Sequence, residues 1–253
     1  MIEVQDVTHR YGERLAVDGV SFRVEARELV ALVGASGSGK TTTLKMINRL
    51  VAPSAGRVLV EGEDVATLET HGLRRRIGYV FQGIGLFPHM SVGENVGVPL
   101  RLAGWTKDRA RARVRELLEL VQLDPELTPR QPSELSGGQQ QRVGVARALA
   151  VSPRVMLLDE PFGALDPLTR DRLQQSFVEL RRRLDLTAVL VTHDMAEALL
   201  LADRVGVMHA GRLVQIGTPA ELLRAPADDH VASLLETPRR QARRLDDLLG
   251  AGA

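Results

Sequence analysis

A glycine-rich stretch, VGASGSGKTTTL at residues 33–44, constrains the fold of this chain more than any other part of its sequence. It follows the compact apolar run ELVALVG and precedes TTTLKMINRL, in which Leu44, Ile47 and Leu50 recur at helical spacing. The predicted order is therefore strand, loop and helix. Glycines let backbone N–H groups converge on an anion without a Cβ in the way, and a helix start adds about half a positive charge. We predict an anion-binding loop here.

The loop fits the nucleotide-binding pattern G-x-x-x-x-G-K-[ST], with Gly34, Gly39, Lys40 and Thr41 at the fixed positions. The pattern predicts that Lys40 reaches the β- and γ-phosphates and that the Thr41 hydroxyl binds Mg²⁺. The alternative is a plain glycine-rich turn, which does not account for the complete pattern between a strand and a helix. We expect Lys40 to be exposed, and we expect nucleotide contacts along the whole loop: Gly34, Ala35, Ser36, Gly37, Ser38, Gly39, Lys40, Thr41 and Thr42.

A second candidate site lies in the segment VMLLDEP. Its four apolar residues, Val155 to Leu158, predict a central strand whose carboxyl end presents Asp159 to Mg²⁺, directly or through water. Glu160 follows, placed to orient and polarise an attacking water molecule, a role worth about 10² to 10⁴ in rate. An acidic pair at a strand end could instead cap the following helix. Beside an anion-binding loop, we favour metal ligation and catalysis.

The composition limits the possible partners of the chain. Its 253 residues are 44% hydrophobic, enough for a sizeable core, and 33 basic against 32 acidic residues leave no net field that would attract nucleic acid. Cysteine is absent, which excludes disulfides, thiolate zinc sites and iron–sulfur ligation. The charged N-terminal stretch is unlike a secretory signal, and no segment approaches the roughly 18–20 apolar residues of a membrane span. We expect a soluble chain.

Strand and helix patterns alternate along the chain, which favours an α/β fold with a parallel sheet covered on both faces. Period-2 patterns near both ends of the first third predict short strands, some of them antiparallel. Residues 91–123 have a helical pattern, and strands and helices alternate again from 154 to 217. The segment 236–253 is predicted to be a polar helix or a frayed tail.

A third motif, ELSGGQQQRVGVARAL, points to a family. It places Ser136, Gly137 and Gly138 directly before a predicted helix, forming a second anion-binding helix start that the first nucleotide does not need. The sequence from Leu135 to Arg142 resembles the signature of ABC-transporter ATPases, and the motifs of the chain occur in that family's order. Arg142 itself is expected to brace the signature helix without contacting nucleotide.

The resemblance covers residues 1–235 and implies a fold. We expect a P-loop NTPase with a RecA-like, mostly parallel sheet flanked by helices, an N-terminal antiparallel β subdomain, and an inserted helical subdomain at about 88–150. The remaining residues, 236–253, are expected to form a tail with no appended regulatory domain.

Four further residues match functional positions of the family. Tyr11 matches the aromatic residue that stacks on adenine, and Gln82 matches the glutamine that approaches Mg²⁺ and water and couples the two lobes. Asp166, in GALD, matches the loop residue that crosses the dimer, and His193 matches the switch histidine at the γ-phosphate. Taken singly, Tyr11 could be a packed turn residue, Gln82 a surface amide and His193 a satisfied histidine at a strand end.

The resemblance also implies partners. In the family, two subunits sandwich two ATP molecules, each held by the glycine loop of one chain and by the residues matching 136–139 of the other. We expect two copies of this chain at the cytoplasmic face of the cell membrane, acting on separate permease subunits and indirectly on a solute-binding protein, with no nucleic acid. We predict that the segment 83–95 docks a permease helix, with core packing as the alternative for its apolar residues: Ile84, Leu86, Phe87 and Met90.

The transported solute is indicated by two shorter likenesses. The segments KMINRL and IGLFPHM resemble the ATPase subunits of osmoprotectant importers, which take up glycine betaine, choline, carnitine or proline, and amino-acid importers remain the alternative. DNA-repair and chromosome ATPases typically carry coiled-coil or zinc-bearing insertions, whereas only 53 positions separate Gln82 from Leu135. ABC proteins of translation usually hold two cassettes, and this sequence has one glycine loop and one signature.

Overall fold

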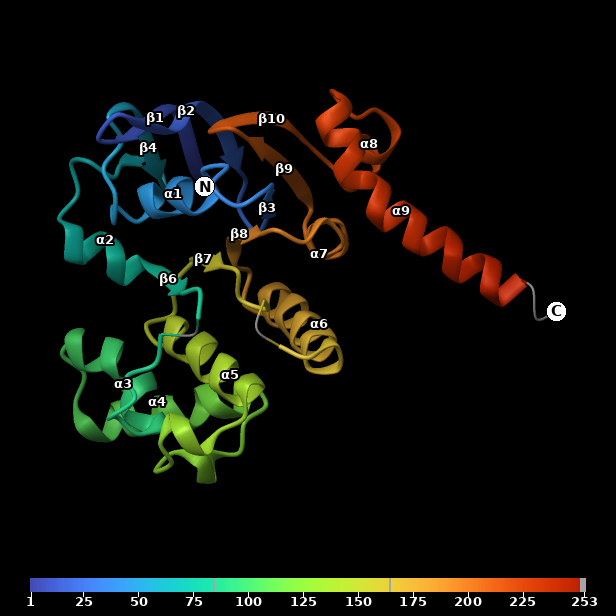
Figure 1. The fold of residues 1–253 in the computed structure, drawn as a ribbon. Coiled ribbons are helices and arrows are strands. Elements are labelled where there is room, and N and C mark those ends of the chain that lie inside the picture. Colours follow the sequence, from blue (N-terminus) through green and yellow to red (C-terminus); the bar gives the residue numbers. More distant parts are fainter. Residues whose placement is uncertain (84, 164, 251–253) are drawn as a thin grey trace.

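The computed structural model of the chain describes residues 1–83, 85–163 and 165–250. Its strands form two sheets, with helices packed around them (Figure 1). The strands are β1 (Ile2–Tyr11), β2 (Arg14–Val24), β3 (Leu29–Val33), β4 (Ala55–Val60), β5 (Glu63–Asp64), β6 (Ile77–Val80), β7 (Val155–Asp159), β8 (Thr187–Thr192), β9 (Arg204–His209) and β10 (Arg212–Gly217). The α-helices are α1 (Lys40–Ile47), α2 (Thr70–Arg76), α3 (Val92–Leu102), α4 (Lys107–Leu120), α5 (Gly137–Ala148), α6 (Pro167–Arg183), α7 (Met195–Leu201), α8 (Pro219–Arg224) and α9 (Asp229–Gly250). Two 3-10 helices are η1 (Pro125–Leu127) and η2 (Pro132–Glu134).

The N-terminal strands form an antiparallel sheet with the order β2-β1-β4-β5. Its apolar residues alternate along β1 and β2, as expected for a sheet with one covered face. These residues pack with Leu44 and Ile47 of α1 and with Leu32 and Val189 of the second sheet in one buried cluster. The antiparallel sheet therefore covers α1 and one face of the second sheet.

The second, central sheet is mostly parallel, with the order β10-β9-β3-β8-β7-β6 and an antiparallel pair at the β9–β10 edge. Every residue of β3, β7 and β8 is buried, because helices or the other sheet cover both faces. The register pairs Val33 with Thr192, and Asp159 with Val191. The carboxyl ends of these three strands therefore lie together at one edge. The predicted α/β fold is confirmed.

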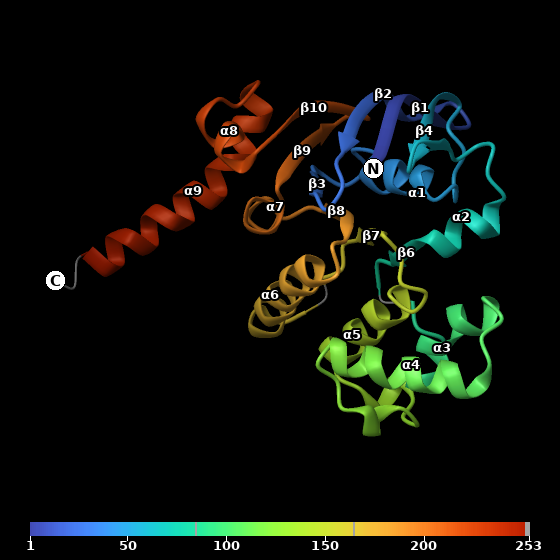
Figure 2. The same ribbon diagram turned by 180° about the vertical axis from the view of Figure 1, so that it is seen from behind.

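Helices α3, α4 and α5 lie between β6 and β7 in the sequence and form what we call the helical lobe, residues 92–148. Figures 1 and 2 both show it projecting from the central sheet on the side away from α1 and the antiparallel sheet. The helical pattern of residues 91–123 corresponds to two helices, because the chain turns at Gly104, whose φ is 76°. The domain boundaries implied by the resemblance stay a prediction.

The C-terminal part of the described chain consists of α8 and α9. Helix α9 leaves the body of the molecule in both views, and it corresponds to the polar helix that was one of two expectations for this end (Figure 1, Figure 2). None of the helices within the described residues combines the length and apolar character that crossing a membrane requires.

Candidate functional site

The glycine loop joins the buried end of β3 to the first residue of α1. Gly39 caps the helix with a φ of 101°, and a Cβ built on it would lie 2.6 Å from the carbonyl oxygen of Ala16. A Cβ on Gly34 would lie 2.1 Å from the carbonyl oxygen of Met208. Real Cβ atoms do not approach backbone so closely, so β2 and β9 require glycine at both ends of the loop.

Lys40 is turned into the loop. Its Nζ atom donates hydrogen bonds to the carbonyl oxygens of Gly34, at 2.8 Å, and Ala35, at 2.9 Å. The side chain is buried, so our expectation of an exposed lysine was wrong; the carbonyl groups of the tight loop draw the ammonium inward. Burial lowers the pKa of Lys40, and the nearby charges of Glu160 and Asp159 oppose that shift.

The Thr41 hydroxyl and the Asp159 carboxylate meet directly. Thr41 Oγ1 donates to Asp159 Oδ1 at 2.8 Å, and the hydroxyl of Tyr79, on β6, donates to Asp159 Oδ2 at 3.4 Å. Burial raises the pKa of Asp159, while the hydrogen bond from Thr41 lowers it. A hydroxyl and a carboxylate oxygen held together are the donors that Mg²⁺ prefers, so these residues fit the predicted metal.

The carboxylate of Glu160 contacts two of the other predicted residues. Gln82 Nε2 donates to Glu160 Oε2 at 3.2 Å, and His193 Nδ1 lies 3.4 Å from the same oxygen. The three residues follow the carboxyl ends of β6, β7 and β8. Glu160 has a left-handed backbone, with φ at 46°, and its N–H donates to the carbonyl oxygen of Val191 at 2.9 Å. This kinked backbone follows directly after the last residue of β7.

The signature residues form a second group. Ser136 caps α5 in a reciprocal turn, in which its Oγ accepts from Gln139 N at 3.3 Å and Gln139 Oε1 accepts from Ser136 N at 2.9 Å. Asp166 caps α6 by accepting from Thr169 N at 3.0 Å. The first turns of α5 and α6 pack closely against each other. A Cβ built on Gly138 would lie only 2.5 Å from Thr169 Cγ2. A cavity of about 460 Å³ opens beside them, lined in part by Ser136, Gly138, Gln139, Arg142 and Arg172.

The other residues singled out by the sequence have separate contacts. Tyr11 ends β1 and is 51% exposed, with its ring packed edge-on against His9. Arg142 braces α5 against the end of α4, because its Nη1 atom donates to the carbonyl oxygens of Val121 and Gln122. Its expected role as a brace thus agrees with the contacts. Ile84 lies outside the described residues.

Sequence reasoning missed two residues. Tyr79 reaches Asp159 from β6, which pairs with β7 so that Tyr79 lies opposite Leu157. The period-2 pattern of β6 could have indicated this position only if the neighbouring strand had been known. Arg147, in the last turn of α5, donates to the carbonyl oxygen of Gly85 at 2.8 Å. Its position near the end of the signature helix gave no signal.

Comparisons with known proteins identify the family of the chain. A family model described as "ABC transporter" matches residues 17–163. The choline transport ATP-binding protein of Bacillus subtilis is 49% identical over 94% of this chain, and the match covers 63% of that protein. The osmoprotectant import ATP-binding protein of Salmonella typhimurium is 48% identical over the whole chain, with 67% of that protein covered. The chain thus spans about two thirds of the length of these relatives.

Among solved structures, the chain is similar to the ATP-binding cassette MJ0796, seen as a dimer in a post-hydrolysis state bound to ADP and Pi. The TM-score is 0.78 at 33% identity, and the match covers 87% of this chain and 99% of that one. The family resemblance of the three motifs is therefore confirmed. The chain belongs to the ABC transporter family of ATP-binding proteins.

Proposed function

We propose that the chain binds and hydrolyses ATP as the ATPase subunit of an importer of osmoprotectants. The observation that carries the proposal is the meeting of Gln82 and His193 at one carboxylate oxygen of Glu160, next to the Thr41–Asp159 pair. A carboxylate oriented from two sides at the edge of a phosphate-binding loop is placed to polarise a water molecule. A strand-end acidic pair that only capped a helix would not need these partners.

Each residue has a defined task in this reaction. The Lys40 ammonium group would exchange its two carbonyl partners for the β- and γ-phosphates, while loop N–H groups bind the same oxygens. Thr41 and Asp159 would hold Mg²⁺, and the family resemblance implies that Gln82 is a third ligand. Bound Mg²⁺ supplies charge neutralisation on the phosphates. Glu160 would accept the proton of the attacking water, and His193 would hold the γ-phosphate.

A second copy of the chain would complete the site. The signature group, Ser136 to Gln139, and Asp166 lie at the starts of α5 and α6. Figure 1 shows α5 and α1 in different parts of the molecule, so one chain does not close its own signature over its own loop. A head-to-tail pair would bring each signature to the other chain's nucleotide, with Tyr11 stacked on adenine. The dimeric cassette noted above supports the pairing of two copies.

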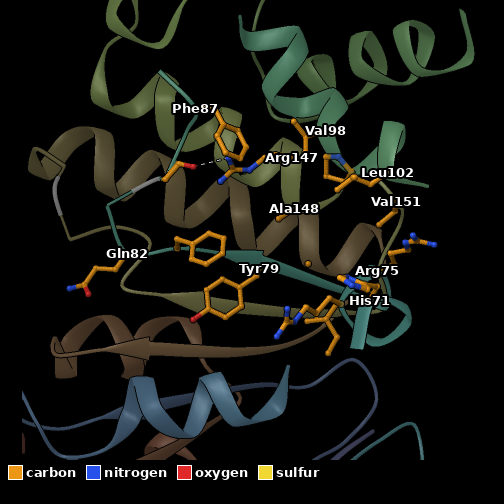
Figure 3. A pocket seen from close by; sticks show the side chains of 16 residues that line it. His71, Arg75, Tyr79, Gln82, Phe87, Val98, Leu102, Arg147, Ala148 and Val151 are labelled. Atoms are coloured by element: carbon orange, nitrogen blue, oxygen red, sulfur yellow. Dashed lines mark hydrogen bonds between the residues drawn. The ribbon is translucent and has the colours of Figure 1, made fainter. Parts of the chain in front are cut away.

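The permease partner has a candidate docking groove. The groove has a volume of about 700 Å³ and lies between the end of β6, the helical lobe and α2 (Figure 3). Phe81 is 44% exposed and Phe87 40% exposed, and both line the groove with Gln82 at one end. Exposed aromatic rings in a groove indicate an apolar partner. The groove supports our prediction that part of the segment 83–95 binds a permease helix.

A crosslinking experiment tests the docking. Because the chain has no cysteine, single cysteines at Phe87 and Met90 can be paired with cysteines in a cytoplasmic permease helix. We expect crosslinks at the exposed Phe87, and none from a control cysteine at the buried Val96 of α3. Absence of crosslinks from both Phe87, which lines the groove, and Met90 in an intact transporter would contradict the docking.

The solute and the location are the finer parts of the proposal. The names of the relatives above support choline and related osmoprotectants as the solute. The proposed peripheral position at the cytoplasmic face of the membrane is what the family resemblance implies. Purified ATPase should hydrolyse MgATP, and Glu160→Gln should bind ATP without hydrolysing it. In proteoliposomes with the permease and the solute-binding protein, choline or glycine betaine should accelerate hydrolysis. Stimulation by an amino acid instead would overturn the solute while leaving the ATPase intact.

A further inference from the structure

Arg147 is a charged side chain buried at the wall of the groove. It lies in the last turn of α5 and is 8% exposed, with its guanidinium 5.7 Å from the centre of the Phe87 ring. Burial lowers the pKa of Arg147. A buried guanidinium group needs hydrogen-bond acceptors. Figure 3 shows Arg147 donating a hydrogen bond to the carbonyl oxygen of Gly85.

The segment from Gln82 to Phe87 is fixed at its far end by the helical lobe. Arg147 holds the Gly85 carbonyl oxygen at 2.8 Å. Asn95 of α3 is fully buried, accepts from the Phe87 N–H at 2.8 Å and donates to the Phe87 carbonyl oxygen at 3.1 Å. Two side chains from two helices of the lobe therefore determine where this part of the segment lies.

The near end of the same segment reaches the catalytic carboxylate. Gln82 Nε2 lies 3.2 Å from Glu160 Oε2, and Gly85 lies three positions after Gln82 in the sequence. Gly85 N donates to the Gly83 carbonyl oxygen at 2.7 Å, which joins Gly85 to the residue directly after Gln82. This hydrogen bond gives a displacement of Gly85 a direct route to Gln82.

The helix that carries Arg147 also carries the signature. Ser136 caps its start, and Arg147 lies about 16 Å further along the helix. A helix of this length moves as a rigid body, so a rotation that brings Ser136 toward a second subunit also moves the guanidinium.

We propose that Arg147 is a positioning residue that sets the placement of Gln82 beside Glu160 through the Gly85 carbonyl group, and so links the signature helix to the hydrolytic centre. The inference rests on the proposed ATPase function. It predicts that loss of the guanidinium slows hydrolysis without weakening ATP binding, because the Gly85 and Phe87 contacts of Arg147 lie in the segment after Gln82, outside the glycine loop and the Thr41–Asp159 pair.

A double-mutant cycle on the purified ATPase tests the proposal. Arg147→Met should lower kcat about tenfold to a hundredfold, the effect of a misplacement of about 1 Å, with KM for ATP unchanged within about twofold. In a Gln82→Ala background the same change should have no further effect, because the residue through which Arg147 acts is gone. Arg147→Lys keeps the charge and a hydrogen-bond donor, so its kcat should lie between those of the wild type and Arg147→Met. If Arg147→Met fails to fold, Arg147→Lys serves as the test variant.

The matched control is Arg113→Met. Arg113 of α4 also donates to carbonyl groups near the end of α5, at Leu149 and Ala150, but it lies away from the segment that follows Gln82. A similar fall in kcat for both arginine variants, or additive losses for Arg147→Met and Gln82→Ala, would overturn the positioning role. The proposed ATPase function is tested separately, by MgATP hydrolysis that the wild type shows and Glu160→Gln abolishes. If the wild type does not hydrolyse MgATP, both proposals are overturned.

Discussion

The contact between α5 and α6 at Gly138 offers a sharp test of the packing that positions the signature. A Cβ on Gly138 would lie 2.5 Å from Thr169 Cγ2. Non-bonded carbon atoms make their best contact at about 3.5–4.0 Å, so in Gly138→Ala the threonine methyl must move by about 1 Å or α5 must shift. Thr169 resists this movement, because its N–H donates to Asp166 and its side chain lowers the pKa of that carboxyl by hydrogen bonding.

The size of the effect follows from two opposing contributions. Overpacking of this kind costs about 1–3 kcal/mol, whereas replacing a helical glycine by alanine gains up to about 1 kcal/mol. Gly138→Ala alone should therefore lower the free energy of unfolding by up to about 3 kcal/mol. Thr169→Ser removes the methyl group and keeps the hydroxyl, so in that background Gly138→Ala should be neutral or stabilising.

The assay is thermal and urea unfolding of the wild type, the two single variants and the double variant. For a chain of this length, about 1 kcal/mol corresponds to about 2–4 °C in Tm. We expect a coupling free energy of about 1–3 kcal/mol between Gly138 and Thr169, with recovery of ATPase activity in the double variant. Additive effects within about 0.5 kcal/mol would refute the contact.

Three further predictions concern single side chains. Lys40→Met should abolish ATP binding in calorimetry yet leave Tm within about 4 °C, because the lost hydrogen bonds to Gly34, Ala35 and Ser38 are offset by relief of a buried charge; a larger fall in Tm would contradict this. With MgATP, Glu160→Gln should turn from the 27.7 kDa monomer into a dimer of about 55 kDa by light scattering, and adding Ser136→Glu should reverse this through like-charge repulsion. ATP-bound monomers, alone and with permease, would exclude the sandwich. Burial raises the pKa of Glu197, so the folded state binds more protons and stability should fall as pH rises from the unfolded to the folded pKa. Glu197→Gln should remove that slope in urea unfolding at about pH 4 to 8, and an unchanged slope would assign it to another group.

The meeting of Gln82, Glu160 and His193 could be anticipated, because each follows an apolar strand and parallel strands end at the same edge of a sheet. The strand, loop and helix around Lys40 were equally readable from local pattern. These predictions depended on the spacing of residues within short segments, which can be read directly from the sequence.

Contacts between distant segments could not be anticipated in the same way. The burial of Lys40 depends on carbonyl groups whose direction is set by the loop backbone, and the bond from Tyr79 to Asp159 depends on the order of β6 and β7 in the sheet. The approach of Gly138 to Thr169 joins two helices that are separated by β7. Each depends on tertiary packing, for which neither periodicity nor composition carries a signal.

The left-handed backbone of Glu160 has a consequence for protein engineering. A residue with a side chain and a positive φ carries about 1–2 kcal/mol of conformational strain, which glycine would not. Glu160→Gly would therefore rank among the stabilising changes in a screen that selects only for heat resistance, and it would discard the carboxylate proposed to activate water. Directed evolution of this ATPase for thermal tolerance should thus be screened on turnover in every round.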